Sequence, residues 1–151
     1  MVEALRARAD HARARTAIDA AQRHGFAILG YDDTAYPAHL RELADPPLIL
    51  FLRGETTSLH APMVAIVGSR KATAYGRSVT ESIATELARA GAVIVSGLAF
   101  GIDAVAHRAA VAAGGVSVGV LASGVDYITP RSHRDLGESL LSRGAVVSEY
   151  L

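Results

Sequence analysis

The sequence predicts an α/β fold in which a parallel β-sheet carries helices on both faces, preceded by a small N-terminal extension of helix and strand. Three observations support this prediction. From residue 63 onwards, short apolar runs alternate with helix-length segments, which is typical of βαβ units. Glycine-rich turns follow the first two apolar runs. Half of the 151 residues are hydrophobic and a fifth are charged, a composition that favours a packed core over disorder.

The first unit of this pattern spans residues 63–95. Met63–Val67 is an unbroken apolar run, as expected of a strand that is buried on both faces. A helix is expected over residues 74–90, because apolar side chains recur there at helical spacing. The recurring residues are Val79, Ile83, Leu87 and Ala90. Gly91 follows in the position of a C-terminal cap, and Ala92–Val95 is predicted to be the second strand.

After the second strand, the pattern continues with a helix and two further strands. The next helix is predicted to begin at Asp103, a residue type favoured as an N-cap, and to end before the glycine pair that starts at Gly114. Val116–Leu121 is predicted to be the third strand and Ala145–Ser148 the fourth. Between them, Ser132 has an acidic residue three positions on, which resembles a capping box that opens a helix.

The N-terminal part of the chain departs from this pattern. Residues 1–25 are rich in arginine and alanine and are predicted to be a helical extension, whereas residues 26–151 are predicted to form the α/β domain. Strands are expected at Phe26–Leu29 and Leu48–Leu52, with a short helix from Tyr36 to about Leu43 between them. Because the parallel pattern has only four strands, we expect one of two explanations: the chain is a fragment that is incomplete at its C-terminus, or the N-terminal strands or a partner complete the sheet.

Composition excludes several classes of site. The absence of cysteine rules out disulfides, thiolate metal sites and thiol nucleophiles. There is no signal-peptide segment and the longest apolar runs are strand-sized, so a cytoplasmic protein without a membrane segment is expected. The formal net charge is zero, so a polyanion would need a local basic patch. The candidate patch is Arg70, Lys71 and Arg77, because no acidic residue occurs between Met63 and Glu81.

The first strand-to-helix turn, residues 68–76, has the chemistry of an anion site. Gly68 lets the backbone approach a phosphate, the following helix offers free N–H groups, and the Arg70 guanidinium can contact two phosphate oxygens. The turn matches neither the dinucleotide-binding nor the Walker A motif, so neither class of nucleotide site has motif support. The alternative interpretation is a tight turn whose glycines serve only its geometry.

The second turn, residues 96–103, is expected at the same carboxyl edge of the sheet, near the point where strand order reverses and open α/β folds bind ligands. Asp103 and His107 share one helical face. They are either an acid–base pair or a capping aspartate and a structural histidine, and the second interpretation is favoured. No second carboxylate accompanies them in the motif, and no other histidine or glutamate has metal-ligand spacing. Phe100 and Tyr127 are candidates for stacking on bases, and Tyr75 follows the first strand in a comparable way.

The ordered set of motifs resembles the DNA-processing protein A (DprA/Smf) family. The resemblance runs from about Tyr36 to Leu151, roughly three-quarters of the chain, and its most specific part lies in residues 96–107. The motifs, in chain order, are Tyr36-Pro37-x-x-Leu40, Asp45-Pro46-Pro47, Arg53-Gly54, Val67-Gly68-Ser69-Arg70, Tyr75-Gly76, Ser96-Gly97-Leu98-Ala99-x-Gly101-Ile102-Asp103-x-x-Ala106-His107, Gly124 and Ser148-Glu149.

The resemblance implies an extended Rossmann fold that binds single-stranded DNA in a basic pocket and loads the recombinase RecA onto it during natural transformation and recombination. It also implies that the complete protein is a homodimer. It implies no enzymatic activity, no metal and no cofactor. The phosphate-binding residues that it implies are Gly68, Ser69 and Arg70 with Ser96, Gly97 and Ala99. Two features depart from the family: Thr129-Pro130 and His133 replace a Tyr-Pro pair and an asparagine, and the segment beyond Leu151 is missing.

Two other functions remain open from the sequence. One is a nucleotide phosphoribohydrolase on the related lysine-decarboxylase-like fold, but the Pro-Gly-Gly-x-Gly-Thr loop of that group is absent. The other is a nucleotide-sensing or purely structural module.

Overall fold

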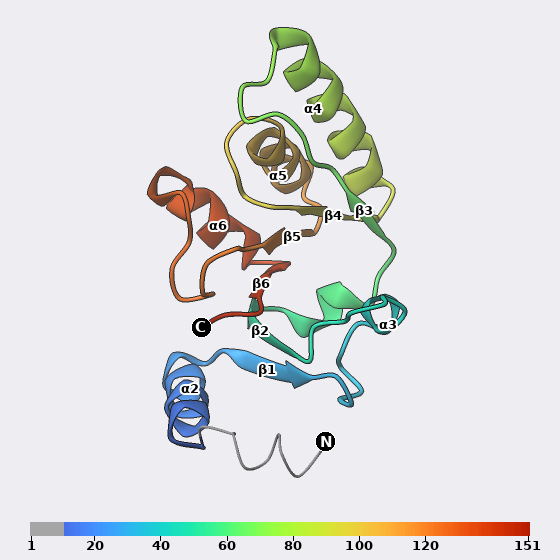
Figure 1. Ribbon diagram of the computed structural model, residues 1–151. Coiled ribbons are helices and arrows are strands. Elements are labelled where there is room, and N and C mark those ends of the chain that lie inside the picture. The colour runs from blue at the N-terminus through green and yellow to red at the C-terminus, as the bar shows by residue number, and fades with distance from the viewer. Residues whose placement is uncertain (1–10) are drawn as a thin grey trace.

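A six-stranded sheet organises the computed structural model, which describes residues 11–151 (Figure 1). Its strands are β1 (Ala27–Gly30), β2 (Ile49–Gly54), β3 (Met63–Ala65), β4 (Val93–Ser96), β5 (Ser117–Val120) and β6 (Ala145–Ser148). Across the sheet their order is β1-β2-β6-β5-β4-β3. The last four are parallel, whereas β2 pairs antiparallel with both β1 and β6. The predicted parallel sheet is confirmed, and the N-terminal strands extend it as expected.

Helices connect the parallel strands and surround the N-terminal ones. The α-helices are α2 (His11–His24), α3 (Ala38–Arg41), α4 (Ala74–Arg89), α5 (Ile102–Ala112) and α6 (Arg134–Leu140), and the 3-10 helices are η1 (Thr56–Leu59) and η2 (Arg131–His133). The prediction of a helical N-terminal extension holds for residues 11–24, and residues 1–10 lie outside the described part. Within the described residues, no helix is long and apolar enough to cross a membrane.

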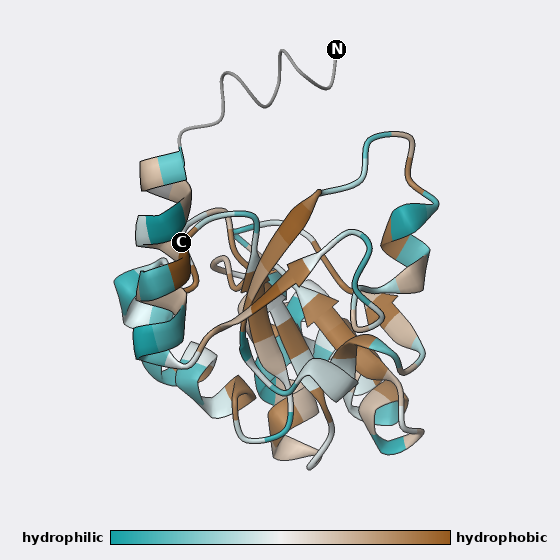
Figure 2. Cartoon of the chain, turned by 90° about the horizontal axis from the view of Figure 1, so that it is seen from below, coloured by the Kyte–Doolittle hydropathy of each residue, from teal (hydrophilic) through white to brown (hydrophobic). Residues whose placement is uncertain are grey.

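The two faces of the sheet are covered unequally. Alternate strand residues point to opposite faces, so Ile94 packs against α4 and α5 while its neighbour Val93 packs on the other side. Helices α4, α5 and α6 cover the first face. On the second face Val93 and Val118 pack with Leu59 of η1. Both faces therefore carry helical elements, and Figure 2 shows the hydrophobic strands between them.

The buried side of α4 differs from the prediction. Val79 and Ile83 are 36% and 48% exposed, and the helix instead buries Ala84 and Ala88. These alanines pack against Ala106 of α5 in a shared cluster. Small side chains allow two helix backbones to approach closely, so the alanine face is the packing face although it carries less apolar area.

Three differences between predicted and observed element boundaries affect the loops beside the parallel strands. Strand β3 ends at Ala65, and Val67 is 72% exposed because the chain leaves the sheet there. Helix α5 begins one residue before Asp103, with Gly101 as its N-cap. Ser132 does not cap a helix: it lies within η2, and the N-cap of α6 is His133, whose side chain makes no capping hydrogen bond.

Candidate functional site

The loops that follow β3 and β4 lie in direct backbone contact. The backbone N–H of Ile102 donates to the carbonyl oxygen of Ser69 at 3.2 Å. Gly101 has φ +80°, and a Cβ there would overlap that same Ser69 carbonyl. A Cβ on Gly68 would lie 2.8 Å from Cγ1 of Ile102. Both glycines therefore serve the close approach of the two loops.

The position of these loops was predicted correctly, but for a partly wrong reason. Strands β3, β4, β5 and β6 follow one another across the sheet in chain order, so no reversal of strand order occurs among them. The loops meet at the carboxyl edge because β3 and β4 are parallel neighbours.

A crevice of about 260 Å³ opens between these loops and the loop that follows β5. It brings together four of the sequence-predicted site residues, Arg70, Gly97, Ala99 and Phe100, and adds Ala122, Thr129 and Pro130 on the opposite wall. The other predicted phosphate-binding residues, Gly68, Ser69, Lys71, Arg77 and Ser96, do not line it.

Several of those other residues instead hold the loops in shape. The Ser96 hydroxyl is buried and donates to the carbonyl oxygen of Ile66 at 2.6 Å. Nη1 of Arg77 donates to the carbonyl oxygen of Ala72 at 2.5 Å. The Ser69 hydroxyl oxygen accepts the backbone N–H of the exposed Lys71 at 3.1 Å. Ser96 and Arg77 thus have protein partners in place of a ligand.

Arg70 is the cation of the crevice. It is exposed, and within residues 11–151 its side chain makes no hydrogen bond or ion pair. No acidic residue lines the described crevice. Its guanidinium is therefore free to contact an anion from solvent.

The aromatic side chain of the crevice, Phe100, is 50% exposed and packs edge-on against His133, with ring centroids 4.8 Å apart. Nδ1 of His133 lies 2.7 Å from the carbonyl oxygen of Leu98 and is hydrogen-bonded to it. Leu98 is fully buried and has φ +55°, an uncommon conformation for leucine. His133 thus fixes both this backbone and the Phe100 ring.

Asp103 and His107 are both buried but do not bond to each other. The Asp103 carboxylate accepts the N–H of Gly97, so the predicted capping role was wrong. Nδ1 of His107 is hydrogen-bonded to the Ser117 hydroxyl at 2.8 Å, and that hydroxyl donates to the Ile94 carbonyl. Burial lowers the pKa of His107 to about 4, although the nearby Asp103 carboxylate acts in the opposite direction. Each side chain therefore has a structural partner.

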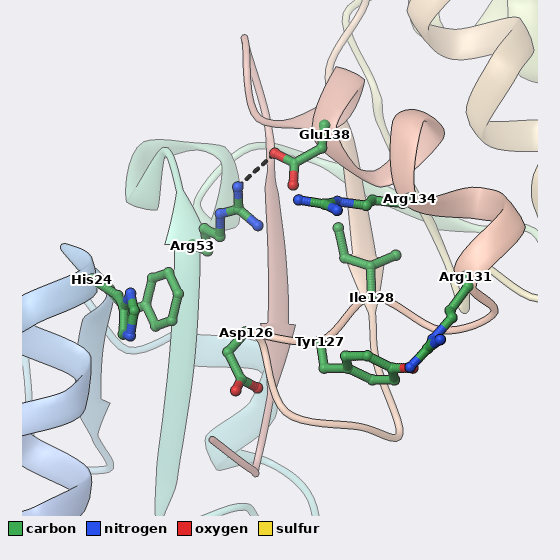
Figure 3. Close-up of a pocket in the computed structure, with 9 residues that line it drawn as sticks. His24, Arg53, Asp126, Tyr127, Ile128, Arg131, Arg134 and Glu138 are labelled. Atoms are coloured by element: carbon green, nitrogen blue, oxygen red, sulfur yellow. Dashed lines mark hydrogen bonds and ion pairs between the residues drawn. The ribbon is translucent and has the colours of Figure 1, made fainter.

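The remaining aromatic candidates lie outside the crevice. Tyr75 is 79% exposed and lines neither the crevice nor the larger cavity described next. Tyr127 lies in the loop that follows β5, but it lines a different and larger cavity of about 780 Å³ (Figure 3). Local sequence patterns do not indicate this cavity, because its walls come from segments far apart in the chain. Across residues 11–151, no three histidine or acidic side chains gather as metal ligands would.

Comparison with known proteins gives one consistent family. The family model described as DNA recombination-mediator protein A matches residues 27–151. The chain is 45% identical to protein Smf of Escherichia coli over 124 residues, which are 82% of this chain and 33% of that protein. It is 38% identical to DNA processing protein DprA of Bacillus subtilis over 127 residues, 83% of this chain and 43% of that one. The chain thus spans less than half the length of these relatives.

Two solved structures share the fold. The X-ray structure of DNA processing protein A from Streptococcus pneumoniae matches with a TM-score of 0.78 and 38% identity, over 83% of this chain and 44% of that chain. DNA processing protein A from Helicobacter pylori, whose structure gives insight into its single-stranded DNA binding mode, matches with a TM-score of 0.71 and 33% identity. That match covers 83% of this chain and 55% of the Helicobacter pylori chain.

Proposed function

Because the chain belongs to the DNA recombination-mediator protein A (DprA/Smf) family, we propose that it binds single-stranded DNA in the crevice between the loops after β3 and β4. The observation that carries the proposal is the state of the Arg70 side chain. Its guanidinium is exposed at the crevice without a partner in residues 11–151, and it faces an acid-free lining. A guanidinium in this position binds a phosphate through charge-assisted hydrogen bonds.

The contribution of the glycine loops is indirect. The N–H of Gly97 already donates to Asp103, so this group is not free for a phosphate. A Cβ at Gly97 would lie 2.8 Å from Oδ2 of Asp103, so glycine is required there for the carboxylate to approach. We therefore assign the phosphate contact to Arg70, with Lys71 beside it, and assign positioning of the loop to Gly97.

Phe100 supplies the second part of the proposed site. Its ring is half exposed in the crevice and is held by His133, so a base can stack on it at little entropic cost. Stacking on an aromatic ring contributes about 1–3 kcal/mol per base and is tolerant of sequence. The bases of a duplex are paired and cannot turn onto the ring, so we expect single strands to be preferred.

The proposal is for binding and not for catalysis. The described lining of the crevice contains no carboxylate and no imidazole, the groups that would serve a nucleotide hydrolase as general acid or base. Asp103 and His107 are each committed to a partner within the protein.

The wider role concerns a longer protein. We propose that it acts in the cytoplasm as a homodimer and helps to load RecA onto single strands during natural transformation and recombination. The family description as a recombination mediator supports this proposal. RecA ATPase activity on single strands, measured with and without this chain, tests whether these residues suffice.

Fluorescence anisotropy with a labelled single-stranded oligonucleotide tests the crevice. Arg70→Ala should weaken binding by about 1.5–3 kcal/mol, roughly 10- to 150-fold, as expected for loss of a charge-assisted contact. Arg89→Ala removes an equal charge from an exposed position on α4 that lines no described cavity, and should leave the affinity unchanged. If a folded Arg70→Ala protein binds as tightly as the unchanged protein, Arg70 is not part of the site.

A further inference from the structure

The larger cavity contains cationic and aromatic groups that the proposed crevice does not use (Figure 3). It lies between strand β2, the start of α6 and the short connection from α2 to β1. Its lining residues are His24, Phe26, Arg53, Asp126, Tyr127, Ile128, Arg131, Arg134 and Glu138. At about 780 Å³ it has room for a nucleotide-sized group.

Three arginines from separate elements reach this cavity, but they are not equally free. Arg53 is paired with Glu138, with Nη2 and Oε2 2.5 Å apart. Arg134 is exposed and makes no hydrogen bond or ion pair within the described residues, and Figure 3 shows its guanidinium directed toward that of Arg53. Nε of Arg131 donates to the Tyr127 hydroxyl, which leaves its terminal nitrogens open. Arg131 and Arg134 are therefore the cations available to an anion.

Aromatic rings stand on both sides of the cavity. The Arg131 guanidinium lies over the Tyr127 ring, 5.5 Å from its centroid, and Tyr127 is 45% exposed. On the opposite wall His24 and Phe26 stack at 5.4 Å with 21° between their planes. A guanidinium beside an exposed ring is the combination that grips single-stranded nucleic acid, by phosphate contact and base stacking together.

One loop separates this cavity from the crevice. Ala122, Thr129 and Pro130 of the loop line the crevice, whereas its residues 126–128 line the cavity. The Ser123 hydroxyl donates to the Tyr127 carbonyl at 2.7 Å and lies 3.1 Å from the Thr129 hydroxyl, so the loop is braced internally. A strand that leaves the crevice over this loop reaches the cavity next.

We propose that the cavity lined by Tyr127, Arg131 and Arg134 is a second subsite for the same DNA strand, in which each of the two arginines contacts backbone phosphate and a base stacks against Tyr127. This inference rests on the proposed function of the crevice. It assigns to Tyr127 and Arg131 a role apart from the crevice, because neither lines it. A long strand then occupies both subsites, and a short one occupies only the crevice.

Anisotropy with labelled oligothymidylates of about four and about twelve nucleotides tests this division. The double variant Arg131→Gln/Arg134→Gln should weaken binding of the longer strand about tenfold and leave the shorter strand unaffected. Arg70→Ala should weaken both. Arg89→Gln/Arg108→Gln removes the same charge from exposed positions on α4 and α5, and should change neither.

The outcomes separate the two proposals. If the longer strand loses nothing, or both lengths lose equally, while Arg70→Ala still weakens both, the second subsite is wrong and the crevice stands. If the unchanged protein binds neither length, both proposals are wrong.

Discussion

The carboxylate of Asp103 accepts a hydrogen bond from the backbone N–H of Gly97, with Oδ2 and N 3.1 Å apart. This bond ties the first turn of α5 to the loop that forms one wall of the crevice. Asp103 is only 6% exposed, so a variant without the acceptor leaves the partly buried N–H of Gly97 unpaired. We predict that Asp103→Ala lowers the free energy of unfolding by about 1–3 kcal/mol, measured by urea denaturation.

A graded pair of substitutions checks that cause. Asp103→Asn keeps an acceptor oxygen and should lose less stability than Asp103→Ala. Asp135→Ala removes an exposed carboxylate from the first turn of α6 and should have little effect. Equal unfolding midpoints for Asp103→Ala and the unchanged protein would contradict the prediction.

Gly101 gives a second prediction about the same loops. An alanine there needs a positive φ and also overlaps the Ser69 carbonyl. Gly114 has a similar φ, +74°, but nothing lies within 4 Å of a Cβ built on it. Gly114→Ala should therefore cost only the backbone strain, about 1 kcal/mol, and Gly101→Ala about 3 kcal/mol or more. Similar losses in urea denaturation for the two variants would show that the loops can separate freely.

The buried His107 predicts a dependence of stability on pH. Its pKa is lowered from the ordinary 6.5 to about 4 in the folded protein, so between these values the unfolded chain binds a proton that the folded chain does not. The stability that the neutral His107 contributes is fully present above pH 6.5. As the pH falls toward 4, the free energy of unfolding therefore decreases by on the order of 3 kcal/mol.

Urea denaturation over this pH range measures that loss. His107→Asn removes the titrating group, so the free energy of unfolding of this variant should fall less steeply between pH 6.5 and 4 than that of the unchanged protein. An NMR titration that places the His107 midpoint near 6.5 would contradict the burial on which the prediction depends.

The strands and the crevice loops could be predicted from local sequence because their signals are local. Strand β6 has its predicted bounds, since an apolar run follows Gly144 directly. The buried face of α4 could not be predicted in this way. Large apolar residues mark one side of the helix, but the alanines of α5 opposite it favour Ala84 and Ala88 for close packing.

The larger cavity could not be predicted from local sequence patterns either, but for a different reason. Arg53 and Glu138 are 85 residues apart and meet only because β2 pairs with β6. No spacing rule connects an arginine in an N-terminal strand with a helix near the C-terminus. The Arg53-Gly54 motif was a signal that this position matters, but it gave no indication of its partner.

The dependence of binding on salt is the last prediction. The net charge is zero, so affinity for DNA must come from the few local cations: Arg70 at the crevice with Lys71 next to it in the chain, and Arg131 and Arg134 at the cavity. Contact with two to four phosphates gives a log–log salt slope of about −1.4 to −2.8, at about −0.7 per phosphate of a single strand. Stacking on Phe100 should supply about 1–3 kcal/mol that salt does not screen, and duplex cannot use it. Salt titrations with single- and double-stranded oligonucleotides of equal length measure both effects. A much steeper slope, or equal affinity for the two forms, would mean that the protein binds DNA by charge alone.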